Sequence, residues 1–388
     1  MTKIKAAKQH YFLFIFWLWV IPQSIKLTSL YSLYNTPIDY INTISDYSVL
    51  LLALLYIFLY QKYSKSDFAK IVVIGILSII SAFRCHNFSL VSLFIIVVAA
   101  GDINIEKILK KYFHFGVFFV LITILLSFVG FIPDEVIIRY RDVRHSMGFR
   151  HPNILGIEVA QFVIIYMYLH RTNKFLKTVV LSVLSIIFLY FVPNSRTAYL
   201  LIGVIFFLFM IIQILERKKK STRHLFIALF ILAIVFNVFS IYFGITNGRS
   251  FLQNILGLPE QYTTALARIT GGYDAYRIYG VHLFGTEVIL DIQESWGIGH
   301  IWLDNTYLTL LIRYGIIMYI VFSFSYYYLM HIKKESNVYL FIILFGYCVY
   351  GVLEPSMFIF VYNDFLLFYK DILFKKNNEV REKIKHYR

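Results

Sequence analysis

Residues 199–215 of the chain read YLLIGVIFFLFMIIQIL and contain no charged side chain, and residues 216–220, ERKKK, follow at once. A helix that crosses a bilayer needs about 20 predominantly apolar residues. A cluster of Lys and Arg directly after such a run marks its cytoplasmic end. This stretch therefore predicts a membrane-spanning helix that ends in the cytoplasm.

The rest of the chain repeats this pattern. Of its 388 residues, 59% are hydrophobic and only 15% are charged, and the mean hydropathy is +0.69. Soluble domains carry roughly 25% charged residues. We expect an all-α, polytopic integral membrane protein, with one membrane domain over residues 1–388 and about twelve transmembrane helices. The expected spans are 11–30, 46–60, 68–83, 88–100, 112–131, 154–169, 175–191, 198–215, 225–243, 304–330, 338–353 and 357–374.

The net charge of +15 is explained by membrane topology. Most Lys and Arg residues fall in alternate gaps between the expected spans, as they do in residues 216–220, which puts both termini in the cytoplasm. Lys3, Lys5 and Lys8 precede the first apolar run, and we expect that run to remain as an uncleaved helix. No basic stripe with interleaved aromatic residues lies on a soluble unit, so nucleic-acid binding is excluded. The cytoplasmic (inner) membrane is the expected location.

The gaps expected on the outer side carry arginine, whereas the inner gaps carry mostly lysine. The outer basic residues are Lys26, Arg84, Arg139, Arg141, Arg144, Arg150, Arg196, Arg249, Arg268 and Arg277. Arginine presents a planar, permanently charged fork that binds phosphate or carboxylate through paired hydrogen bonds. We therefore expect an anionic ligand on the outer face. The alternative is ion pairing with neighbouring carboxylates, namely Asp134, Glu135, Asp142 and Asp274.

Two outer segments are long, one over residues 132–153 and one over residues 244–303, between spans 9 and 10. Loops of that length are usually functional or disordered. The second segment contains many apolar residues, among them Leu252, Leu256 and Ile269. That content favours re-entrant or interfacial helices over disorder.

Four motifs lie in these outer segments or at span ends. The first, GFRHPNILG at residues 148–156, puts His151 in extended backbone and Pro152 in the first turn of a helix. The free N–H groups at the start of that helix could bind an anion. The second is PNSRTA at residues 193–198, which contains Arg196. The third is Arg268, followed by Arg277 and Phe284-Gly285. The fourth is His300 with DNTYL at residues 304–308 and Gly315, where Asp304 could also be a simple helix cap.

In this order the motifs resemble the O-antigen polymerase and ligase superfamily, the Wzy and WaaL types, over roughly residues 148–316. The resemblance implies a GT-C-like membrane glycosyltransferase whose outer arginines grip the pyrophosphate of an undecaprenyl-linked glycan. Arg196 and Arg268 would take that role, with Arg150 and Arg277 as further candidates. The candidates for the general base are Asp304, His300 and His151, in decreasing order. Ligases of the superfamily carry a His where this chain has Asp304, so a polymerase is favoured.

The implied reaction transfers a growing glycan from undecaprenyl pyrophosphate to the next lipid-linked repeat unit. Donor and acceptor are both undecaprenyl-pyrophosphate-linked oligosaccharides. The resemblance also implies a chain-length regulator and a flippase as partners. No acidic metal-binding motif lies in an outer loop, so neither a metal nor another cofactor is expected. The alternatives are a ligase of the same superfamily and a lipid-linked oligosaccharide flippase or transporter, although span interiors hold few charges, chiefly Glu158 and Arg313.

Overall fold

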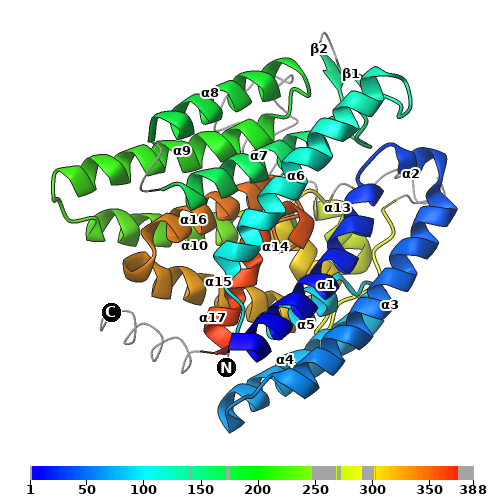
Figure 1. Ribbon diagram of the computed structural model, residues 1–388, viewed down its shortest axis with the longest axis vertical. Coiled ribbons are helices and arrows are strands. Elements are labelled where there is room, and N and C mark those ends of the chain that lie inside the picture. Colours follow the sequence, from blue (N-terminus) through cyan, green and yellow to red (C-terminus); the bar gives the residue numbers. More distant parts are fainter. Residues whose placement is uncertain are drawn as a thin grey trace. The chain divides into compact units, whose positions relative to one another are not determined.

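The computed structural model describes residues 2–139, 142–171, 175–246, 268, 272–290, 301 and 303–374, and helices dominate these ranges (Figure 1). The chain divides into two compact units, each assembled from separate segments. The first unit comprises Met1–Ser64, Ser92–Ile211 and Phe360–Arg388, and the second comprises Lys65–Val91 and Ile212–Ile359. The expected single membrane domain stays a prediction.

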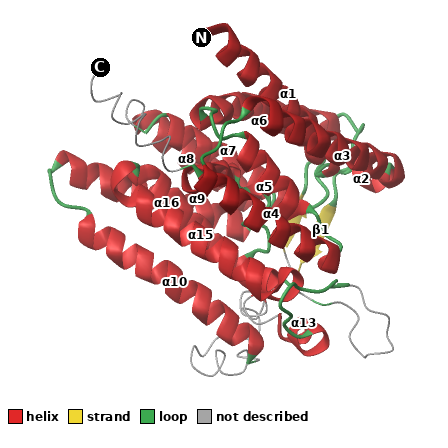
Figure 2. Ribbon diagram, turned by 90° about the horizontal axis from the view of Figure 1, so that it is seen from below, coloured by secondary structure: helices red, strands yellow, loops and turns green. Residues whose placement is uncertain are grey.

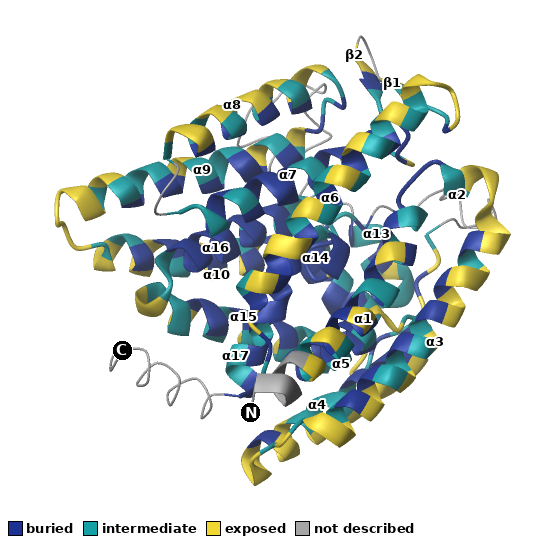
Figure 3. Cartoon of the chain, in the orientation of Figure 1, coloured by how far each residue is buried: buried dark blue, intermediate teal, exposed yellow. Residues whose placement is uncertain are grey.

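Within the described ranges, seven helices are long and apolar enough to cross a membrane. They are Asn35–Tyr60, Lys65–Cys85, Ile105–Phe128, Pro152–Leu169, Arg196–Arg217, Arg223–Ile245 and Thr306–Ser336. Three shorter apolar helices are Ser89–Ala99, Phe175–Phe191 and Val338–Leu353. Large apolar side chains such as Tyr47, Phe58 and Leu59 are exposed on the first of the seven, as the hydrocarbon core of a bilayer allows (Figure 3). These helices suggest a polytopic membrane-embedded protein, and the count of twelve spans stays a prediction.

In the first unit, helices that are close in sequence pack on one another. Its elements are α1 (Thr2–Lys26), α2 (Leu30–Leu33), α3 (Asn35–Tyr60), most of α5 (Ser89–Ala99), α6 (Ile105–Phe128), α7 (Pro152–Leu169), α8 (Phe175–Phe191) and most of α9 (Arg196–Arg217). Helix α1 packs on α3, and α7 packs on both α6 and α8. Because α7 is enclosed by neighbours, 72% of the residues in its most apolar stretch are buried. The corresponding share is 22% for both α3 and α6.

A β-hairpin interrupts the helices of the first unit. Strands β1 (Val136–Arg139) and β2 (Asp142–His145) pair antiparallel, with Val136 opposite His145. The β-branched run Val136-Ile137-Ile138 favours a strand, because such side chains fit a pleated, half-buried surface. The outer segment 132–153, which we expected to be a loop, therefore contains regular structure.

The last expected span, residues 357–374, is not a single helix, so that prediction is wrong. The chain forms two short 3₁₀ helices, η4 (Phe360–Tyr362) and η5 (Asp364–Tyr369), and then α17 (Lys370–Leu373). Asn363 and Asp364 lie at the break, and side chains of these types compete with helical backbone hydrogen bonds. The Lys370 ammonium donates to the carbonyls of Ala100 and Ile103, which hold this segment within the first unit.

The second unit is built around α10 (Arg223–Ile245), α15 (Gly315–Ser336) and α16 (Val338–Leu353), which lie side by side (Figure 2). Its other elements are α4 (Lys65–Cys85), α13 (Gly272–Tyr279), α14 (Thr306–Thr309) and the π-helical turn η3 (Leu310–Tyr314). The segments α14, η3 and α15 follow one another without a gap. A π-helical turn inside a longer helix is rare and often lies at a functional site.

Candidate functional site

Three charged side chains meet in the second unit. The Arg268 guanidinium donates to the Glu354 carboxylate and, at 3.2 Å, to the carbonyl of Leu353. Arg268 Nε also lies 3.9 Å from Asp304 Oδ2. The side chains of Arg268, Glu354 and Asp304 are only 23%, 13% and 26% exposed. The structure thus brings together Arg268 and Asp304, which belong to two separate sequence motifs, and adds Glu354.

The residue after Asp304 fixes the start of α14. Asn305 is the N-cap of α14, and its Oδ1 accepts hydrogen bonds from the N–H groups of Tyr307 and Leu308 at 2.9 and 3.2 Å. The Asn305 amide also donates to Ser240 on α10. The interpretation of Asp304 as a simple helix cap is therefore wrong, because Asn305 performs that function.

Thr306 forms hydrogen bonds between the start of α14 and the chain at the end of α16. Its hydroxyl donates to the Glu354 carbonyl at 2.6 Å and accepts from the N–H of Met357 at 3.2 Å. These bonds fix the backbone of Glu354 next to Asp304. The two carboxylates therefore lie on helix ends that are hydrogen-bonded to each other.

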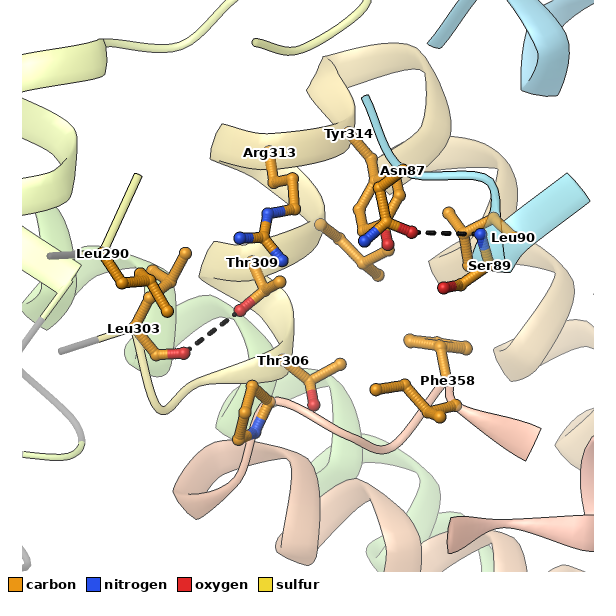
Figure 4. Close-up of a pocket in the computed structure, with 13 residues that line it drawn as sticks. Asn87, Ser89, Leu90, Leu290, Leu303, Thr306, Thr309, Arg313, Tyr314 and Phe358 are labelled. Carbon is orange, nitrogen blue, oxygen red and sulfur yellow. Dashed lines mark hydrogen bonds between the residues drawn. The ribbon is translucent and has the colours of Figure 1, made fainter. Parts of the chain in front are cut away.

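A cavity of about 160 Å³ adjoins this group of charges (Figure 4). Thr306 and Pro355 border it, so the cavity begins where the charged group ends. Among the described residues that line the cavity, only Arg313 is charged, and Figure 4 shows its side chain extending toward Thr309. The lining residues are Asn87, Ser89, Leu90, Leu290, Leu303, Thr306, Thr309, Leu310, Arg313, Tyr314, Pro355, Phe358 and Ile359.

Two glycines position Arg313. Gly285 and Gly315 have φ angles of +79° and +91°, where side chains are strained. A Cβ on Gly285 would lie 2.0 Å from the Arg313 carbonyl oxygen, so the two backbones can touch only without side chains. That carbonyl accepts from Thr286 N–H at 3.0 Å, and Arg313 Nη2 donates to the Val288 carbonyl at 3.2 Å. The third and fourth motifs therefore meet at this crossing.

In the first unit, Arg144 joins the first two motifs. It is 9% exposed, and its Nε donates to the Pro193 carbonyl at 3.0 Å while Nη2 donates to Asn153 Oδ1. Gly156 is needed at the same place, since a Cβ there would lie 2.3 Å from Ser195 Oγ. Sequence reasoning counted Arg144 as one of many outer arginines and did not separate it from the exposed ones.

The predicted site residues of the first unit lie nearer its surface. His151 is extended and caps α7, with Nδ1 accepting from Asn153 N–H at 3.0 Å, as its place before Pro152 predicted. The Arg150 guanidinium lies over the Tyr31 ring, 4.1 Å from its centre. Arg196, at the first position of α9, is 62% exposed and lies 3.4 Å from Asp142. Such an exposed pair contributes little to stability, which leaves Arg196 available to a ligand.

Asp134 anchors the hairpin. Its Oδ1 accepts from the N–H groups of Ser146 and Met147 at 2.8 and 2.7 Å, and its Oδ2 lies 2.6 Å from His145 Nδ1. Partial burial raises the pKa of this carboxyl, but the hydrogen bonds from His145 and from the backbone lower it by more. The net pKa of Asp134 is therefore below its ordinary value of 3.8.

The remaining site residues are Arg277 and His300, which the sequence predicted, and Glu354, which it did not. Arg277 is exposed on α13, with its guanidinium 5.8 Å from the centre of the Tyr273 ring, and His300 lies outside the described residues. Glu354 was missed, although an acidic residue directly after the apolar run 338–353 marks a span end on the expected outer side. Within the ranges that the structure describes, no three His, Cys, Asp or Glu side chains are grouped as metal ligands.

Comparisons with known proteins give no relative: no protein-family model, no curated protein and no solved structure matches the chain.

Proposed function

We propose that this chain is an oligosaccharide repeat-unit polymerase of the Wzy type. The observation that carries the proposal is the convergence of Arg268, Asp304 and Glu354 beside a cavity. Paired carboxylates held by a guanidinium supply a base in a defined orientation, and a neighbouring cavity supplies room for a substrate. The order of the four sequence motifs supports the same function.

The membrane context of the proposal follows from the charge pattern. The protein would lie in the cytoplasmic membrane with about twelve spans, a GT-C-like arrangement and both termini in the cytoplasm. The ends of α14 and α16 that carry the charged group would then face the outer side. Lipid-linked repeat units, delivered by a flippase, would approach through the bilayer, and a chain-length regulator would be a further partner.

In the proposed reaction, a hydroxyl oxygen of the acceptor repeat unit attacks the anomeric carbon of the donor glycan. The bond between that carbon and the pyrophosphate oxygen breaks, and undecaprenyl pyrophosphate leaves with the electron pair. The hydroxyl proton passes to a carboxylate, for which Asp304 is the first candidate and Glu354 the second. Arg268 orients both carboxylates and lies close to the charge that develops on the leaving group.

Of the other arginines, Arg196 is the most available to a pyrophosphate, because it is exposed and its ion pair with Asp142 is weak. Arg150 is held over a tyrosine ring, and Arg277 lies outside the charged group, so both are weaker candidates. His151 is the weakest base, since its Nδ1 is engaged in capping α7.

The test is the glycan profile of cells that depend on this protein. Arg268→Ala and Arg196→Ala should each abolish long-chain polysaccharide and leave single lipid-linked repeats. Arg223→Ala, which removes an exposed charge at the start of α10, is the matched control and should leave the profile unchanged. Normal chain lengths in both arginine variants would end the proposal. Long polymer that is made but not attached to its acceptor would indicate a ligase instead.

A further inference from the structure

The cavity beside the charged group contains a cation with unused hydrogen-bonding capacity. A guanidinium carries five N–H donors, and within the described part of the chain Arg313 forms one hydrogen bond, to the Val288 carbonyl. Among the described residues, no carboxylate forms an ion pair with Arg313, whereas Arg268 has two such partners. A half-buried cation with no countercharge among its described neighbours is suited to bind an anion that enters the cavity, because an uncompensated buried charge is costly.

The walls of the cavity restrict what that anion can be. Polar groups come from Asn87, Ser89 and Thr309, and most of the remaining surface is apolar, including the rings of Tyr314 and Phe358. The volume of about 160 Å³ is close to that of an engineered cavity of about 150 Å³ that admits a benzene ring. It therefore accommodates one six-membered ring.

A sugar ring with a carboxylate matches this lining better than a bare phosphate does. Its C–H face needs apolar and aromatic contacts, its hydroxyls need partners such as Thr309 and Asn87, and its carboxylate needs the guanidinium. A diphosphate is polar on every side and would leave the apolar walls without a partner. The arrangement of one cation within a largely apolar lining thus favours an acidic sugar.

We infer that this cavity binds one uronic-acid residue of the glycan repeat unit, with its carboxylate on Arg313. The inference rests on the proposed function and names its substrate class as an acidic polysaccharide. Arg313 would be a specificity residue, and Gly285 and Gly315 would hold it at the cavity wall.

Ligand-detected NMR on the purified protein in lipid nanodiscs tests this with D-glucuronic acid, D-glucose and inorganic pyrophosphate as probes. We expect glucuronate to bind about 10- to 100-fold more tightly than glucose, the usual range for a hydrogen-bonded ion pair. Arg313→Gln should remove this preference, Arg313→Lys should retain part of it, and Arg223→Gln should retain all of it. Arg223 begins α10, a helix of 23 residues, so its far end lies roughly 35 Å away at 1.5 Å per residue.

Equal binding of the two sugars, or a preference that survives in Arg313→Gln, would overturn the inference. So would Arg313-dependent binding of pyrophosphate that excludes glucuronate, because the cavity would then be a diphosphate site. The assay needs no turnover, so it is independent of the proposed function. If Arg268→Ala and Arg196→Ala both keep normal polymer while Arg313→Gln loses the glucuronate preference, the polymerase proposal fails and the sugar site stands.

Discussion

Arg268 donates a hydrogen bond to the carboxylate of Glu354, although 86 residues separate the two along the chain. The Nε atom of the same guanidinium lies 3.9 Å from Asp304 Oδ2. Arg268 therefore pairs with two carboxylates and is hydrogen-bonded to that of Glu354. With two negative partners, it has less positive charge available for a pyrophosphate than its place in the sequence suggested.

The coupling between Arg268 and Glu354 can be measured with a double-mutant cycle on thermal unfolding in detergent. For Arg268→Gln, Glu354→Gln and the double variant, we expect an interaction energy of about 0.5–3 kcal/mol, as for contacting residues in one charged network. The matched pair is Lys26 and Asp39, 2.7 Å apart but 36% and 45% exposed, for which less than about 1 kcal/mol is expected. Strictly additive effects at Arg268 and Glu354 would contradict the arrangement.

The glycine crossing that holds Arg313 should not accept a side chain. Gly285→Ala places a methyl group 2.0 Å from the Arg313 carbonyl at a φ of +79°, so we expect a loss of several kcal/mol in unfolding free energy. Gly203→Ala is the control, because nothing lies within 4 Å of its Cβ, and Ala in a helix should be neutral or stabilising by about 1 kcal/mol. Equal melting temperatures for the two variants would show that the backbones do not touch at Gly285.

The close packing of α7 on the start of α9 gives a rescue experiment. Gly156→Ala would place its Cβ 2.3 Å from Ser195 Oγ and 2.4 Å from Ser195 Cβ, so the variant should unfold at a lower temperature. Adding Ser195→Gly removes both atoms and should restore part of the loss. If the second change worsens the first, the contact between α7 and Ser195 is not the cause.

Part of this arrangement could be predicted from sequence. His151 before Pro152 fixed a helix start, because proline restricts the preceding residue and fits the first turn. Apolar runs likewise predicted α7, α9, α10 and α16 to within a few residues. These signals are local, and each depends on a residue and its immediate neighbours.

The remaining features depend on contacts between distant segments. Glu354 acquires a role only because α16 ends beside Arg268, and Asp304 is distinguished from a helix cap only by the position of Asn305. The segment after Pro355 was expected to span the membrane because its mean hydropathy is high. One polar residue such as Asn363 hardly lowers an average over many apolar neighbours, although it interrupts the helix.

The pH dependence of the hairpin follows from Asp134. Its pKa is lower in the folded chain than the ordinary 3.8, so ionised Asp134 stabilises the fold. This contribution is fully present above about pH 5 and is lost as the pH falls below about 4, through the folded-state pKa. The stability difference between wild type and Asp134→Asn should therefore be constant near neutral pH and shrink in acid. Limited proteolysis of residues 132–146 at each pH measures this stability difference. A difference that grows in acid would contradict the assigned hydrogen bonds.

The proposed function assigns the joining of glycan repeats to the site formed by Arg268, Asp304 and Glu354. The most direct measurement is incubation of the purified protein, in vesicles without any ion gradient, with lipid-linked repeat units from cells that lack it. We predict a ladder of longer lipid-linked glycans from the wild-type protein and single repeats only from Asp304→Asn with Glu354→Gln. Repeats that cross the bilayer without being joined, or a full ladder from the double variant, would contradict the account.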